Sequence, residues 1–268
     1  MSHLSHWSFR FAKKVIIRPA QFDRLAKAST ERFENELVIH LNTFASRHCE
    51  VIGEEYVRQV IRLGFEKCER YSFTLQGPIR FFIELMFMFG SHFDTDVQHP
   101  WAAEGLNDKS LSVELMRGDG LHEQMTEYLS QVSGPEHTFA KKALRETRQL
   151  ASEPPPTGNG GLRSQLTTRM QKIYPEKCEY LGRDRLQAVI DGGISVAQSN
   201  DVTSLDGLRL FAVLAFALGH GFANDPLYPW IAGTLNNSPI EDPNIRAEKL
   251  QQKAILYLDR VLAYLEMN

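Results

Sequence analysis

The chain has 268 residues, of which 43% are hydrophobic and 24% are charged, and this balance excludes a disordered or fibrous protein. At roughly 100–200 residues per domain, the length fits one large domain or two small ones. The 30 basic and 33 acidic residues give a net charge of −3, so the overall field favours neither nucleic acid nor an anionic membrane.

Helical periodicity runs through the first half of the chain. Apolar residues between positions 33 and 44 recur at the spacing of one helix face. Cys49 and Gly53 are expected in the connection that follows, where Gly53 suits a helix end. Further helices are expected at 54–71, 75–90 and 100–106, with a last one near 122–132. The helix at 75–90 is apolar nearly all round and should be the most buried.

The second half repeats the first at an offset of 129 residues. Positions 49–107 align without a gap onto 178–236, and 19 of the 59 pairs are identical. The corresponding helices are expected at 162–173, from about 183, at 204–219, and at 246–266, with Pro229 opening a short one. We therefore predict a tandem duplication, because a repeat of this length implies two copies of one structural unit.

These patterns predict an all-α protein made of two pseudo-symmetric halves, each a bundle of four to five helices. Sustained period-2 alternation and hairpin signals, which would indicate strands, are missing from the sequence. The predicted domains are residues 1–134 and 135–268. The Pro- and Gly-rich segment 153–161 has loop composition and is expected to be a connector within the second domain.

Three features favour a cytoplasmic protein. The three cysteines, an odd number, are too far apart for a CxxC pair and are expected to be reduced. The most apolar stretches, 79–90 and 208–222, are shorter than the roughly 18–20 residues that a membrane span needs, and they contain Arg80, Glu84 and Arg209. The N-terminal residues lack the apolar core of a secretory signal. We therefore expect no membrane insertion.

A repeated motif is the most distinctive sequence feature. Its first copy is Phe-Gly-x-x-Phe-x-x-Asp-x-x-x-Pro-Trp. A structural interpretation assigns the glycine to a helix end, the aromatic residues to packing, the aspartate to a turn and the proline to a helix start. A functional interpretation places the rings and the acid beside a ligand cleft. The motif residues are Gly90, Phe93, Asp96, Pro100 and Trp101 in the first copy and Gly219, Phe222, Asp225, Pro229 and Trp230 in the second.

Other chemistry-bearing residues give no catalytic pattern. Arg80 and Arg209 lie in apolar helices, and if buried they need partners, for which Asp96 and Asp225 are candidates. A substrate-binding arginine is the competing interpretation. The nine histidines form no HExxH or other metal-ligand spacing, and P-loop, GxGxxG and GxSxG motifs are missing from the sequence. We therefore predict no catalytic residue, cofactor or metal ligand.

The sequence resembles a family of uncharacterised helical proteins from Gram-negative bacteria. The resemblance rests on VRQVIR at 57–62, on GFEKCERY at 64–71 and on the repeated motif. Members tend to be encoded near type VI secretion spike and toxin genes. The resemblance implies an immunity protein, or a chaperone or adaptor, whose partner is a cognate toxin or secreted effector protein.

The leading hypothesis is therefore a non-enzymatic protein-binding accessory protein. The alternative is a small-ligand-binding protein or enzyme that uses the motif of one repeat, with His220 and Tyr228 beside Asp225 and Trp230 as the ligand rim. Self-association in a purely structural role is a third hypothesis.

Overall fold

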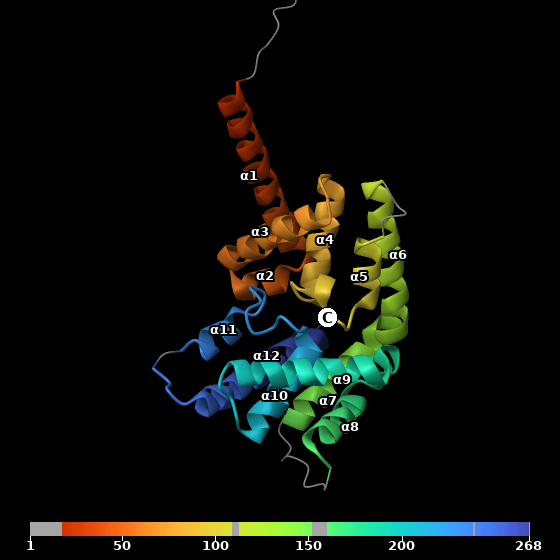
Figure 1. Cartoon of the computed structure of the whole chain (residues 1–268), viewed down its shortest axis with the longest axis vertical. Coiled ribbons are helices and arrows are strands. Elements are labelled where there is room, and N and C mark those ends of the chain that lie inside the picture. Colours follow the sequence, from red (N-terminus) through yellow and green to blue (C-terminus); the bar gives the residue numbers. More distant parts are fainter. Residues whose placement is uncertain (1–17, 109–112, 152–159, 238, 268) are drawn as a thin grey trace, which may run out of the picture.

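A computed structural model describes residues 18–108, 113–151, 160–237 and 239–267. In these residues every regular element is a helix, and the molecule has two lobes (Figure 1). The helices are α1 (Pro19–Phe44), α2 (Ser46–Ile52), α3 (Glu54–Arg70), α4 (Gln76–Phe89), α5 (Pro100–Leu106), α6 (Glu114–Val132), α7 (Thr138–Ala151), α8 (Leu162–Ile173), α9 (Pro175–Ser199), α10 (Leu205–Leu218), α11 (Pro229–Leu235) and α12 (Pro243–Met267), with 3₁₀ turns η1 (Phe93–Thr95) and η2 (Pro135–His137).

The all-α prediction is confirmed for the described residues, and the structure corrects several details. Cys49 lies inside α2 and not in a connection, although Gly53 does end that helix, with a φ of 81°. Helix α6 begins at Glu114, ahead of the expected start. Helix α7 was not predicted. The predicted connector falls largely on residues 152–159, which lie outside the described residues.

Helix bounds in the two halves coincide at the offset of 129 residues. Adding 129 to the bounds of α4 and α5 gives those of α10 and α11. Helices α2 and α3 correspond to α9, which is interrupted at Gly182 with a φ of 68°, where the first half has Gly53. Proline opens α5, α11 and α12, because its fixed φ suits the first helical position.

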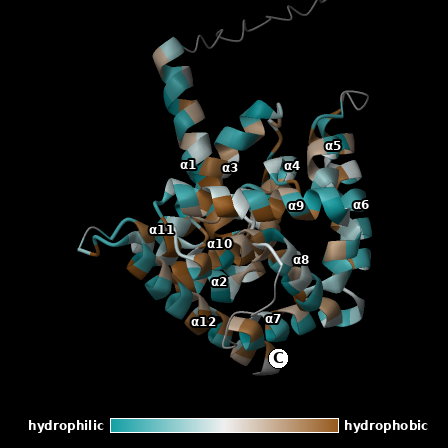
Figure 2. Cartoon of the chain, turned by 60° about the horizontal axis from the view of Figure 1, so that its bottom comes forward, coloured by the Kyte–Doolittle hydropathy of each residue, from teal (hydrophilic) through white to brown (hydrophobic). Residues whose placement is uncertain are grey.

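Each half has its own apolar core. One core contains buried side chains between Leu37 and Val132 together with Leu227 of the second half, and the other contains buried side chains between Ala143 and Ala254. Helices α4 and α10 contribute much of each core, and Phe82 and Phe211 are both fully buried. In Figure 2 hydrophobic colour gathers inside the molecule, as on α10, while outer helix faces are mostly hydrophilic.

Close helix packing explains the glycines at matching places in α3 and α9. A Cβ at Gly64 would lie 2.6 Å from Ile83 Cγ1 of α4, and a Cβ at Gly193 would lie 2.5 Å from Ala212 Cα of α10. Only glycine allows these approaches, which offsets its cost of about 1 kcal/mol in a helix.

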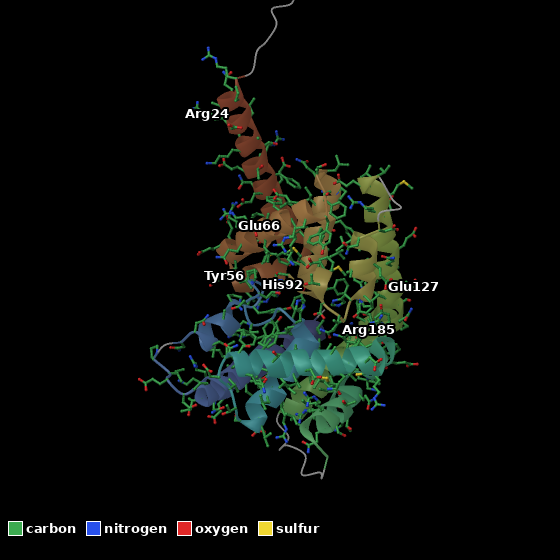
Figure 3. All side chains as sticks on the ribbon, viewed as in Figure 1. Arg24, Tyr56, Glu66, His92, Glu127 and Arg185 are labelled. Atoms are coloured by element: carbon green, nitrogen blue, oxygen red, sulfur yellow. The ribbon has the colours of Figure 1, made fainter. Side chains whose placement is uncertain are left out.

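Helix α1 projects from the body of the molecule (Figure 1). Its C-terminal part buries Leu37 and Leu41, whereas residues 19–32 are exposed, with the side chain of Phe22 not described. Arg24 marks the projecting part in Figure 3. The offset pairs residues 33–44 of α1 with α8, so α1 extends by fourteen residues ahead of the position that corresponds to the start of α8.

Candidate functional site

The two repeated motifs meet at the junction of the halves. Asp96 Oδ2 accepts a hydrogen bond of 2.8 Å from the backbone N–H of His220. Reciprocally, Asp225 accepts bonds from Ser91, at 2.8 Å from the backbone N–H and 2.6 Å from Oγ. Each aspartate therefore binds the residue that follows the motif glycine of the other half. His92, labelled in Figure 3, lies in this region.

Both aspartates also stabilise their own turn. Asp96 Oδ1 accepts the backbone N–H of Gln98, and Asp225 Oδ1 accepts that of Leu227, each at 2.9 Å. These turns lead to Pro100 and Pro229, which start α5 and α11.

The motif glycines let the halves approach each other. Gly90 and Gly219 have φ values of 96° and 93°, in the left-handed region that favours glycine. A Cβ at Gly90 would lie 2.9 Å from the carbonyl oxygen of Leu218, and one at Gly219 would lie 3.1 Å from Asp96 Oδ2. The repeated glycine and aspartate thus hold one junction together.

Charge at the junction is buried and compensated. Burial by itself would raise the pKa of Asp96, but the hydrogen bonds from His220 and from backbone N–H groups hold it well below its usual range. Burial, with the nearby charge of Lys177, lowers the pKa of His99 to about 3, so this imidazole is neutral at pH 7. Both Asp96 and Asp225 are almost fully buried and are unavailable to a ligand.

The motif aromatics serve packing. Phe93 is fully buried, with its ring centroid 5.0 Å from that of Phe82 and 6.2 Å from that of Trp101. Phe222 packs 5.7 Å from Phe211, and Trp230 stacks on the ring of Tyr257 at 5.7 Å. This arrangement favours the structural interpretation of the motif.

The alternative ligand rim does not form around a shared opening. His220 is exposed, and its Nε2 lies 3.3 Å from Thr95 Oγ1 of the first half. Tyr228 points elsewhere, with its ring 6.0 Å from His48 and 6.2 Å from Tyr257. Burial raises the pKa of the Tyr228 hydroxyl well above its usual range.

The expectation that the motif aspartates pair with the two arginines is wrong. Arg80 is exposed on the surface of α4. Arg209 is largely buried, but its Nη1 donates to Asp206 at 2.8 Å and its Nη2 donates to Gln165 at 3.0 Å. The motif aspartates are instead satisfied by N–H and O–H groups at the junction.

Sequence reasoning missed a buried ion pair in the first half. Lys67 Nζ lies 2.6 Å from Asp94 Oδ1, both side chains are almost fully buried, and the hydroxyl of Tyr71 donates to the other oxygen at 3.0 Å. The corresponding positions of the second half are Val196 and Ala223. Because Val196 and Ala223 are apolar, they indicate that Lys67 and Asp94 lie at core-facing positions. This comparison of the two halves is the sequence signal that could have revealed the pair.

The cysteines are free thiols and buried, and burial raises the pKa of Cys68 to about 12. Among the described residues, no group of three or more His, Cys, Asp or Glu side chains is placed to hold a metal ion.

The second half contains a partly open cavity of about 280 Å³. It lies between α7, α8, α10 and α12, and Trp230 of α11 also lines it. Its walls are mainly apolar, and Arg169, Asp206 and Arg209 supply the charged groups. The apolar wall residues include Leu144, Ile173, Leu210, Val213, Ala217 and Leu258.

A surface in the first half corresponds to this cavity at the offset of 129 residues. We name it the α4 face; its residues are Phe44 and His40 of α1 with Phe81, Glu84 and Met88 of α4. Their counterparts Ile173, Arg169, Leu210, Val213 and Ala217 all line the cavity.

The α4 face is partly exposed among the described residues. In the second half, Leu144, Thr147 and Leu150 of α7 line the cavity. The first-half counterpart of α7 falls mostly on residues before 18, which lie outside the described residues. Phe44 and Met88 each keep 44% of their surface exposed. His40 Nε2 lies 2.6 Å from Glu84 Oε1, which links α1 to α4 across the face.

None of the described helices is long and apolar enough to span a membrane. Comparisons with protein families, with curated proteins and with solved structures found no match for this chain.

Proposed function

We propose that this protein is a non-enzymatic binding protein whose α4 face takes up an amphipathic helix of a partner protein. The observation that carries the proposal is the contrast between the halves. Phe44 keeps 44% of its surface exposed, whereas its counterpart Ile173 is buried at the wall of the cavity that α7 lines. Met88 on the same face also keeps 44% of its surface exposed. Apolar faces of surface helices are recognised in this way by helices with apolar residues on one side.

The covering helix in the second half indicates what such a partner presents. Helix α7 places Ala143, Leu144, Thr147 and Leu150 on one side, and Ala143 and Leu150 are buried by the contact. A partner helix with apolar residues at this spacing matches the α4 face. Two large apolar side chains, Phe44 and Met88, are the contacts that would lose the most surface to solvent on binding.

The projecting part of α1 is a second element available to a partner. Residues 19–32 are exposed apart from Phe22, whose side chain is not described, and Leu25 keeps 60% of its surface exposed. A helical segment of this length is marginally stable by itself in water. Contact with a partner along α1 would therefore stabilise it, and α1 leads directly to Phe44 on the α4 face.

The resemblance to proteins encoded near type VI secretion spike and toxin genes supports a secreted toxin or effector as the partner. In that setting this chain acts in the cytoplasm as an immunity protein, or as a chaperone or adaptor for the toxin. The proposal includes a tandem duplication as the origin of the two halves. It is supported by the 19 identical pairs and by the coincident helix bounds.

The test measures the affinity of the full chain for the toxin encoded beside its gene, by isothermal titration calorimetry with purified proteins. Met88→Glu places a charge on the α4 face and should weaken binding at least tenfold, as expected for a central apolar contact. The matched control is Leu256→Glu on α12, an apolar residue with 57% of its surface exposed, and it should bind like the parent protein.

Two results would contradict the proposal. If the parent chain does not associate with the neighbouring toxin, the assigned partner is wrong. If Met88→Glu and Leu256→Glu bind equally well, the α4 face is not the contact. Sedimentation of the parent chain tests whether a second copy of this chain occupies the α4 face. A dimer that dissociates in the Met88→Glu variant would assign the face to that second copy.

A further inference from the structure

The cavity of the second half has a polar end and an apolar body. At the N-terminal end of α10, Arg209 uses its Nη1 for Asp206 and its Nη2 for Gln165. Its Nε is buried and has no hydrogen-bond partner among the described residues. A buried donor without an acceptor is unfavourable, so a site of this kind favours a ligand that supplies the acceptor.

The other end of the cavity lies near Leu218 and Trp230. Leu218 is nine residues after Arg209 on α10, which corresponds to about 13 Å along the helix axis. Trp230 lines the cavity, and its indole Nε1 is also buried without a partner in the described part of the chain. Between the two ends the wall is apolar, with Leu210, Val213 and Leu214 on α10.

We propose that this cavity binds a linear amphipathic carboxylate, of the medium-chain fatty acid class, with its head at Arg209 and its chain along α10. A cavity of about 150 Å³ accommodates a benzene ring, so about 280 Å³ holds a chain of about ten carbon atoms. The carboxylate accepts the Nε–H of Arg209, and a guanidinium is well suited to carboxylate recognition. The site is separate from the α4 face, so this inference does not depend on the proposed function.

Charge in the cavity selects an anionic head. The charged residues of the lining are Arg169, Arg209 and Asp206. Asp206 keeps 66% of its side chain exposed, and a pair with so exposed a partner is weak, so its carboxylate can yield its place to a ligand. An ammonium head would instead face the guanidinium group of Arg209 at this end.

The corresponding positions of the first half do not form this site. Glu84 stands in place of Val213 and Met88 in place of Ala217, so a carboxylate and a longer side chain replace two residues of the apolar cavity wall. Arg80, the counterpart of Arg209, is exposed. This difference provides matched controls within one chain.

Binding of decanoate to the full chain, measured by isothermal titration calorimetry beside decan-1-ol and decylamine, tests the inference. The parent protein and Arg80→Gln should bind decanoate equally, while Arg209→Gln should bind at least tenfold more weakly. Ala217→Met fills the chain-binding space with the side chain of the first half and should also weaken binding at least tenfold. Circular dichroism establishes that each variant is folded.

The outcomes separate the components of the proposal. Saturable binding of decanoate that is lost in Arg209→Gln and in Ala217→Met supports the site, and if Arg209→Gln does not fold, Ala217→Met still reports on the cavity. Decan-1-ol or decylamine binding as tightly as decanoate would overturn the carboxylate assignment. Absence of decanoate binding to the parent chain, or undiminished binding to Ala217→Met, would overturn the site itself.

Discussion

Asp225→Ala is the sharpest test of the junction between the halves. The Asp225 carboxylate keeps 2% of its surface exposed and accepts three hydrogen bonds, two from Ser91 and one from Leu227. Each donor left buried without an acceptor costs about 1–3 kcal/mol, and water entering the vacated space recovers part of that cost. We therefore expect the free energy of unfolding to fall by about 3–5 kcal/mol, because three such costs are only partly recovered by water.

Urea denaturation at pH 7, followed by far-UV circular dichroism, gives the free energy of unfolding from the transition midpoint and slope. Asp191→Ala is the control, because Asp191 forms an ion pair with Arg163 on the surface, with 43% of its side chain exposed. Surface pairs contribute about 0–1 kcal/mol, so this control should unfold close to the parent protein. The reasoning is refuted if Asp225→Ala is destabilised no more than Asp191→Ala.

Two further predictions concern acid sensitivity and helix packing. Because burial lowers the pKa of His99 from 6.5 to about 3, the unfolded chain binds one more proton than the folded chain between these values, so the free energy of unfolding decreases as the pH falls through this window. His99→Tyr should remove about 1.4 kcal/mol per pH unit of that slope in urea denaturation between pH 6 and pH 4, and an unchanged slope would contradict the assignment. Gly193→Ala should destabilise by about 1–3 kcal/mol because of the contact with α10, whereas Gly192→Ala, whose Cβ would meet nothing within 4 Å, should stabilise by about 0.5–1 kcal/mol. Equal melting temperatures for the two alanine variants would show that the close approach is unimportant.

Much of the helical pattern could be predicted because local signals mark its ends. The apolar runs of α4 and α10 end at Gly90 and Gly219, and Pro100 and Pro229 open the helices that follow. These signals act within a few residues, so they can be read from the sequence. Helix α7 is amphipathic as well. It was not predicted, because the other helices were assigned with the help of the repeat. At the offset of 129 residues, α7 corresponds to a segment near the N-terminus for which no helix was predicted.

Contacts between distant segments could not be predicted in the same way. Arg80 and Arg209 are identical residues on matching helices, yet only Arg209 has Gln165 of a neighbouring helix close enough to accept a hydrogen bond. Likewise, the spacing of Asp96 within its motif indicates a turn, but it carries no information that the carboxylate also binds His220 of the other half. Burial and partner choice depend on how the halves dock, which local sequence does not encode.

Within the described residues, the two halves differ in the side chains that face the helix α7 and its counterpart positions. Beside α7, α8, α10 and α12, small and aliphatic side chains such as Val213 and Ala217 line a cavity. In the described part of the first half, Glu84 and Met88 stand at the same positions, and Glu84 lies 2.6 Å from His40 in a partly exposed contact. An enclosed apolar space suits a small amphipathic ligand, whereas an open face with large side chains suits a protein surface. Replacing Val213 and Ala217 by the Glu and Met of the first half should therefore impair carboxylate binding alone. Replacing Glu84 and Met88 by the Val and Ala of the second half should impair partner binding alone.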